Sequence, residues 1–280
     1  MVLDPTLERH YNVRAAIPEH PAIFAAWKAR SEAFRKRAGG VLDVAYGPSA
    51  AETLDLFPAG TSGAPLHLFI HGGYWQALDK ADSSFIAEAL VEAGVTVAVV
   101  NYALCPAVTI DAIVEQMRRA LLWLWRHAGE YGGDAQRIQV SGHSAGGHLV
   151  GMLMATDWPG LDAKAPRRLI ESGVAISGLF DLEPLVHTTI NDKVGMDTGT
   201  ARRLSPLFLD PATPESPLLL AVGGHESEGF HGQSDALTAA WTAKGVAVER
   251  LTLAGRHHLS AVEALADPAT DLFCSAIALQ

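Results

Sequence analysis

The residues whose types and spacing point most directly to chemistry are Gly142-His143-Ser144-Ala145-Gly146. A short apolar run, Ile138–Val140, precedes them, and a stretch of small and apolar residues that suits a helix follows. A serine at a sharp strand-to-helix turn presents its hydroxyl at the tip of the turn, and the helix N-terminus behind it favours developing negative charge. Glycines are needed on both sides because the turn is strained and neighbouring backbones approach closely. We therefore expect Ser144 to be a nucleophile.

A serine nucleophile needs a base within hydrogen-bonding reach and a third group that orients the base. In a parallel sheet such groups belong at the carboxyl ends of the strands. His257 and His258 follow the last apolar strand pattern of the chain, and His258 lies next to a helix expected to begin near Ser260. We expect His258 to be the base, with His257 as the alternative.

The orienting acid is expected after the preceding strand, Leu218–Val222, where Glu226 is the first carboxylate. Asp181 is the alternative, because it follows an earlier strand at residues 174–177 and some enzymes supply the acid from there. The competing role for Asp181 is to cap a helix. Glu228 lies two residues beyond Glu226 and is expected to be solvated.

A second glycine-rich stretch, His71-Gly72-Gly73-Tyr74-Trp75, comes directly after the apolar run 66–70. Glycines let a loop approach closely and turn its N–H groups toward a developing oxyanion. We expect the N–H groups of Gly72, Gly73 and Ala145 to form an oxyanion hole, with His71 bracing the loop. Tyr74 and Trp75 are the candidates for lining a substrate pocket, with packing beneath the pocket as the alternative.

The elements that must position these residues alternate along the chain. Strands are expected at residues 41–46, 53–57, 66–70, 95–100, 138–140, 174–177, 218–222 and 246–253. Helices are expected at residues 19–38, 83–92, 111–128, 145–155, 234–244 and 260–279, with an irregular excursion at 181–210. This alternation predicts an α/β fold, with a mostly parallel eight-stranded sheet and helices on both faces. The first two strands flank Gly47-Pro48 and are expected to pair antiparallel at one edge.

Composition limits the class of protein. The chain has 280 residues without repeats or linker-like stretches, so we expect one domain over residues 1–280, with residues 1–40 as a helical extension packing near the site. Hydrophobic residues make up 49% and charged residues 19%, which argues against disorder. The formal net charge is −10 with scattered acidic residues, which argues against a nucleic-acid-binding surface.

The two cysteines, Cys105 and Cys274, form no CxxC pair and are expected to be free, partly buried thiols in a reducing compartment. The N-terminus lacks the basic and apolar segments of a secretory signal, and no apolar stretch approaches the ~20 residues that span a membrane. We therefore expect a cytoplasmic protein.

With these residues in view, the chain resembles the α/β-hydrolase fold and, within it, the kynurenine formamidase (arylformamidase) branch of the esterase and lipase group. Residues 71–75 are similar to the H-G-G-x-W motif of that branch, where many lipases and esterases have H-G-G-G. The resemblance runs nearly end to end, through Tyr11-Asn12-Val13-Arg14, Tyr46-Gly47, residues 101–106, 142–149 and 177–182, and Leu204-Ser205-Pro206. It implies the triad Ser144, Glu226 and His258 and the oxyanion donors Gly72, Gly73 and Ala145. His225 is a departure, since related sequences often carry a second acidic residue there.

The resemblance implies a serine hydrolase that cleaves a small acyl ester or amide through an acyl-enzyme on Ser144. An aryl formamide such as N-formylkynurenine is the specific substrate it suggests. The alternatives are a general short-chain carboxylesterase and, more distantly, a non-catalytic ligand-binding protein of the same fold. We expect no cofactor, and no metal because H-x-H and H-E-x-x-H patterns are absent. The expected partner is a small-molecule ester or amide, with neither nucleic acid nor membrane, and a homodimer is left open.

Overall fold

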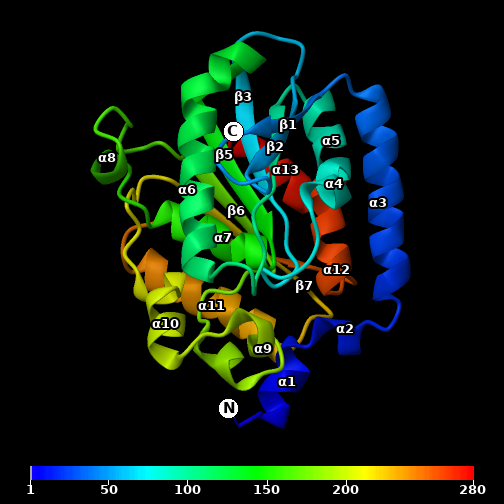
Figure 1. Ribbon diagram of the computed structural model, residues 1–280, viewed down its shortest axis with the longest axis vertical. Coiled ribbons are helices and arrows are strands. Elements are labelled where there is room, and N and C mark those ends of the chain that lie inside the picture. Colours follow the sequence, from blue (N-terminus) through cyan, green and yellow to red (C-terminus); the bar gives the residue numbers. More distant parts are fainter. Residues whose placement is uncertain (1) are drawn as a thin grey trace.

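An eight-stranded sheet forms the centre of the protein in the computed structural model, which describes residues 2–280 (Figure 1). The strands lie in the order β1-β2-β4-β3-β5-β6-β7-β8. The β1–β2 and β2–β4 pairs are antiparallel, and every other neighbouring pair is parallel. The bounds are β1 (Val41–Ala45), β2 (Thr53–Phe57), β3 (Ala64–Ile70), β4 (Thr96–Val100), β5 (Gly133–His143), β6 (Ser172–Ile176), β7 (Leu218–Gly223) and β8 (Val248–Leu253).

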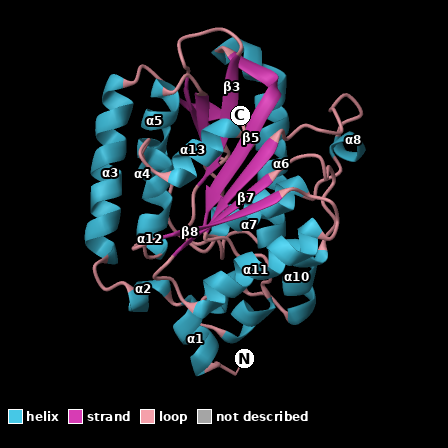
Figure 2. Ribbon diagram, turned by 180° about the vertical axis from the view of Figure 1, so that it is seen from behind, coloured by secondary structure: helices cyan, strands magenta, loops and turns pink. Residues whose placement is uncertain are grey.

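Helices cover both faces of this sheet (Figures 1 and 2). One face carries α6 (Ile110–His127), α7 (Ala145–Met154) and α11 (Glu228–Thr242). The other face carries α3 (His20–Arg37), α4 (Lys80–Ser83), η1 (Ser84–Ile86), α5 (Ala87–Glu92), α12 (His258–Ala261), η5 (Val262–Ala266) and α13 (Asp271–Ala278). A parallel sheet is stable only when both faces are covered, so this layering follows from the strand order.

The central strands β4, β6 and β7 are buried at every residue, whereas the edge strand β1 is mostly exposed. Strands buried on both faces have no solvent side, which is why residues such as 97–100 are continuously apolar. The edge strands β1 and β8 instead contain polar residues among their apolar ones. The sequence prediction of a mostly parallel eight-stranded α/β fold is therefore confirmed.

Two elements, β5 and α11, begin at least five residues earlier than their sequence pattern predicts. Strand β5 starts at Gly133 rather than Ile138, because residues 134–137 are half-buried or exposed and all but Ala135 are polar, so they carry no continuous apolar signal. Helix α11 starts at Glu228 rather than Ser234, because Gly229 and Gly232 in its first turns disguise the helical pattern.

The remaining short helices gather where the parallel strands end (Figure 1, lower end). They are α1 (Pro5–Tyr11), α2 (Val13–Ala16), η3 (Glu183–His187), α9 (Asn191–Val194), α10 (Thr198–Arg203) and η4 (Pro206–Phe208); η2 (Ala128–Tyr131) and α8 (Trp158–Leu161) lie elsewhere. The N–H of Asp4 donates to the carbonyl of His187 at 2.9 Å, which joins the N-terminal segment to the excursion after β6.

Both cysteines are free, and Cys274 is exposed rather than partly buried. Among residues 2–280, no helix combines the length and the apolar character that crossing a membrane requires.

Candidate active site

Ser144 occupies the turn between β5 and α7 with φ 57° and ψ −117°, outside the conformations that a side chain normally favours. A Cβ added to Gly146 would lie 2.1 Å from the carbonyl oxygen of Ile70, and one added to Gly142 would lie 2.4 Å from the Gly146 backbone. Both glycines are therefore required by close backbone approach. The N–H of Ser144 donates to the carbonyl of Ile176 at 2.8 Å, which fixes the turn against β6.

Glu226 and His258 form a buried pair at the ends of β7 and β8. The Nδ1 of His258 donates to Glu226 Oε2 at 2.7 Å, and the Glu226 side chain is 0% exposed. The other carboxylate oxygen accepts from Ser177 Oγ at 2.5 Å and from the N–H of Gly223 at 2.6 Å. Burial raises the pKa of Glu226, but the charge of His258 and these hydrogen bonds outweigh it, so the pKa lies below its usual value. The carboxylate is therefore ionised and points one oxygen at the imidazole.

His143, the residue before the serine, holds the backbone of His258. Its Nε2–H donates to the carbonyl of His258 at 2.9 Å, and the two ring centroids lie 4.8 Å apart. Burial, reinforced by the neighbouring His258, lowers the pKa of His143 to about 3. His143 is therefore a neutral hydrogen-bond donor that positions the backbone of His258. The ring of Phe230 packs on His258 from α11, with centroids 4.3 Å apart.

The alternative base and acids are engaged in capping or exposed to solvent. His257 is the N-cap of α12, and its side chain accepts from the N–H of Ser260 at 3.2 Å. Asp181 accepts from the N–H of Glu183 at 3.0 Å at the start of η3. Glu228 is exposed at the first position of α11. The structure thus brings Glu226 and His258 together and leaves the alternatives in local structural roles.

The loop after β3 places two glycines beside the serine. A Cβ on Gly72 would lie 3.2 Å from Ser144 Cβ, so this backbone touches the nucleophile. Gly73 has φ +102°, and a Cβ there would lie 2.1 Å from the carbonyl oxygen of Ala77. Within residues 2–280, the N–H groups of Gly73 and Ala145 donate to no other group of the protein. These donors remain for a ligand, as an oxyanion hole needs.

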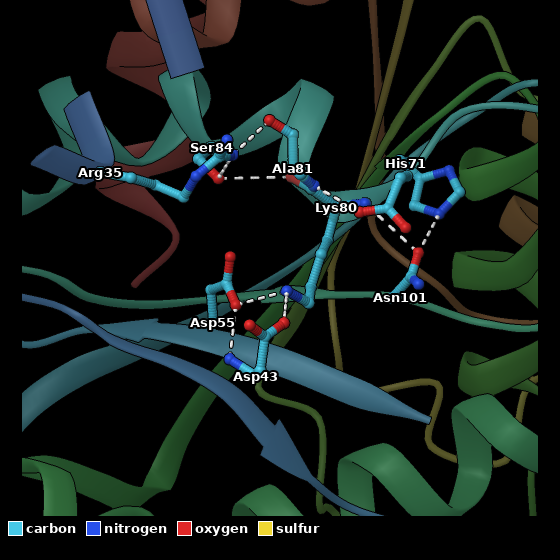
Figure 3. Close-up of polar contacts among 9 residues, drawn as sticks. Arg35, Asp43, Asp55, His71, Lys80, Ala81, Ser84 and Asn101 are labelled. Atoms are coloured by element: carbon cyan, nitrogen blue, oxygen red, sulfur yellow. Dashed lines mark hydrogen bonds and ion pairs between the residues drawn. The ribbon is translucent and has the colours of Figure 1, made fainter. Parts of the chain in front are cut away.

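His71 and Tyr102 brace this loop from below. Their rings stack with centroids 4.3 Å apart, and the Tyr102 hydroxyl donates to the carbonyl of His71 at 2.9 Å. The other side of His71 faces Asn101, with 3.2 Å between Nε2 and Oδ1 (Figure 3). Asn101 Oδ1 also accepts from the N–H of Lys80 at 3.3 Å, which connects the loop to α4.

A buried ion pair fixes α4 in turn. Lys80 Nζ donates to Asp55 on β2 and to Asp43 on β1, each at 2.6 Å (Figure 3). The side chains of Lys80 and Asp55 are 6% and 1% exposed. Arg35 on α3 donates to Ser84 Oγ at 3.0 Å and to the carbonyl of Ala81, so α3 holds the same segment. The glycine loop therefore rests on a chain of contacts that reaches the edge of the sheet.

Ser144 and His258 line one cavity of about 310 Å³, a volume that suits a small molecule. Its walls come from α2, α3, the loop after β3, the segment before and within α9, and α12. Apart from the serine and histidine already described, the wall residues are Asn12, Val13, Arg14, Phe24, Trp27, Gly73, Tyr74, Gln76, Ala77, Leu78, His143, Thr189, Ile190, Lys193 and Leu259.

Tyr74 is part of this wall, but the expectation that Trp75 lines the pocket is wrong. Trp75 is 0% exposed and does not belong to the cavity wall. Its indole packs edge-on to His148, with centroids 5.1 Å apart, and its N–H points to His148 Nδ1 at 3.3 Å. His148 Nε2–H donates to the carbonyl of Leu204 at 2.7 Å, so Trp75 has a structural role beneath the site.

Several wall and support residues escape sequence reasoning. Phe24 and Trp27 on α3 and the segment 189–193 carry no local signal of function. Ser177, which hydrogen-bonds Glu226, directly follows β6, so its position at a carboxyl strand end was a usable signal.

Among residues 2–280, no group of three or more histidines, cysteines or acids has the arrangement of a metal site.

Comparison with known proteins gives one family match, two similar enzymes and one similar crystal structure. Residues 54–196 match the BD-FAE family. The chain is 32% identical to the kynurenine formamidase of Danio rerio over 252 residues, which cover 88% of this chain and 84% of that protein. It is 33% identical to the kynurenine formamidase of Salmo salar, covering 86% and 82%. A crystal structure from Silicibacter sp. TM1040, provisionally named a thioesterase, is 33% identical, covers 96% of this chain and 97% of its own, and superposes with a TM-score of 0.85.

Proposed function

Because the chain belongs to the kynurenine formamidase family of α/β-hydrolases, and is a hydrolase of small esters or amides, we propose that it cleaves aryl formamides such as N-formylkynurenine. The observation that carries this proposal is one cavity that contains Ser144 and His258, the latter bonded to the buried Glu226, beneath an aromatic wall. Phe24, Trp27 and Tyr74 supply that wall. Apolar and aromatic surface suits an aryl leaving group.

In the proposed mechanism His258 Nε2 takes the proton of Ser144 Oγ as the oxygen attacks the formyl carbon. The N–H groups of Gly72, Gly73 and Ala145 stabilise the tetrahedral oxyanion. Collapse breaks the C–N bond, and the imidazolium gives its proton to the departing arylamine. A water molecule, deprotonated by His258, then attacks the formyl ester, and formate leaves as Ser144 regains its proton. Glu226 keeps Nδ1 protonated and stabilises the imidazolium throughout.

The space beside Gly72 supports a small acyl group. A second cavity there measures about 10 Å³, room for roughly one water molecule, and is lined mostly by apolar side chains. It shares Trp27, Leu78 and His143 with the main cavity. The lining includes Phe85 and Val262, so we expect the space to admit a formyl hydrogen or an acetyl methyl group and to exclude a butyryl chain.

The test is kcat/KM on N-formylkynurenine beside p-nitrophenyl acetate and p-nitrophenyl butyrate, with Ser144→Ala as the control for the nucleophile. We expect efficient formamide cleavage, acetyl esters favoured over butyryl esters, and a loss of about 10⁴-fold or more in Ser144→Ala. Rates that rise from acetyl to butyryl, with poor formamide cleavage, would replace this proposal with the general short-chain carboxylesterase. A Ser144→Ala variant that keeps its turnover would refute the mechanism.

A further inference from the structure

Two cations line the active-site cavity without a partner. Arg14 reaches it from α2 and Lys193 from α9. Within the described chain, neither side chain makes an ion pair or a hydrogen bond. By contrast, Arg202 and Arg203 on the nearby α10 are paired with Glu183 and Asp111. The two cavity cations are therefore left available to something that enters the cavity.

No acidic side chain contributes to the cavity wall among residues 2–280. The wall has a formal charge of +2, although the chain has a formal net charge of −10. Glu226 is fully buried behind His258 and bonded on both oxygens. Asp192, beside Lys193 in sequence, faces a different hollow together with Asp197. Charges of one sign in a cleft with apolar walls concentrate ligands of the opposite sign.

The segments that carry these cations are fastened to each other. Glu8 on α1 accepts from the N–H of Thr189 at 2.9 Å and from its hydroxyl at 2.6 Å. The same carboxylate accepts from Asn12 Nδ2 at 2.7 Å, two residues before Arg14. Burial raises the pKa of Glu8, but the Thr189 and Asn12 hydrogen bonds lower it below its usual value. Glu8 is thus occupied in joining the two segments and is not a partner of either cation.

We propose that Arg14 and Lys193 form a subsite for a carboxylate on the leaving-group side of the substrate. The planar guanidinium of Arg14 suits two parallel hydrogen bonds to a carboxylate, and the Lys193 ammonium adds a second charge from the opposite segment. The inference rests on the proposed hydrolysis at Ser144, which defines the bound molecule as a substrate. Among small aryl formamides and esters, the proposed subsite favours substrates whose leaving group carries a carboxylate.

The experiment compares two matched substrate pairs that differ only in this charge. The first pair is N-formylkynurenine and its neutral carboxamide. The second is meta-acetoxybenzoate and meta-acetoxybenzamide, which tests the subsite even if formamides are not cleaved. The variants are Arg14→Gln, Lys193→Gln and the double variant. Lys28→Gln is the matched control, because Lys28 is an exposed cation on α3 that lies outside the cavity wall.

The wild-type protein should favour the anionic member of each pair, chiefly through a lower KM. Each single variant should reduce the ratio of kcat/KM for the anionic to the neutral substrate about tenfold, a size typical of one charge-assisted hydrogen bond. Lys28→Gln should leave that ratio unchanged. Equal kcat/KM values within the ester pair in the wild type would overturn the subsite, and so would variants that slow both members equally. Failure of the formamides alone, with esters cleaved, would count against the proposed substrate and not against the subsite.

Discussion

Replacing Glu226 with glutamine tests the hydrogen bonds that orient His258. In the native protein one carboxylate oxygen accepts from Ser177 and Gly223, and the other accepts from His258 Nδ1. The glutamine oxygen can keep the first two bonds only if its NH2 group faces Nδ1. Two donors then meet, unless the imidazole moves its proton to Nε2. An imidazole protonated at Nε2 cannot accept the proton of Ser144, so the base is lost while the shape of the site is kept.

We expect kcat/KM of Glu226→Gln to fall by about 10³–10⁴-fold, which corresponds to about 4–5.5 kcal/mol of transition-state stabilisation. Initial rates on p-nitrophenyl acetate measure the loss, and thermal unfolding followed by circular dichroism verifies the fold. Asp181→Asn is the matched control, because the asparagine oxygen can still accept from Glu183 at the start of η3. A greater loss of activity in Asp181→Asn than in Glu226→Gln, with both variants folded, would show that the acid comes from the end of β6.

Two further predictions concern stability and are checked by urea unfolding. Lys80→Met should lower the free energy of unfolding by about 3–5 kcal/mol, because Asp55 would stay buried without its cation. Adding Asp55→Asn should restore much of the loss, and a single variant as stable as the wild type would contradict this account. The second prediction is that stability falls by about 3–4 kcal/mol between pH 7 and pH 5.5. Burial lowers the pKa values of His67 and His148 to about 4 and of His143 to about 3, so these three side chains bind protons only in the unfolded chain as the pH drops from 6.5 to 5.5. A free energy of unfolding that is equal at both pH values would contradict it.

Much of the fold follows from local sequence signals. Continuous apolar runs mark the buried parallel strands, and glycines at positions 142 and 146 mark the turn at Ser144. Glu226 and His258 were predicted from their positions just beyond strand ends, because parallel strands bring their carboxyl ends to one edge. The structure places them 2.7 Å apart.

Apart from Tyr74 and the expected placement of residues 1–40 near the site, the walls of the cavity could not be predicted from local patterns. Arg14 and Lys193 meet the same cavity from segments 179 residues apart (193 − 14), and nothing in either local pattern indicates the other. Trp75 is buried against His148, which lies 73 residues further along the chain, and no local pattern indicates that contact. Periodicity describes an element and its faces, but it does not describe which irregular segments fold over a sheet edge.

The contacts of α1 explain how those irregular segments become part of the site. The last carbonyls of a helix lack partners within it, and two of them here accept from side chains of the site's own loops. The Tyr74 hydroxyl donates to the carbonyl of Tyr11 at 2.5 Å, and Ser227 Oγ donates to the carbonyl of His10 at 2.6 Å. Tyr74 belongs to the glycine loop and Ser227 follows Glu226, so the N-terminal segment is docked on the two loops that also carry the chemistry. The strand ends thus carry Ser144, Glu226 and His258, while residues 12–14 and 189–193 contribute to the wall of the cavity that Ser144 and His258 share.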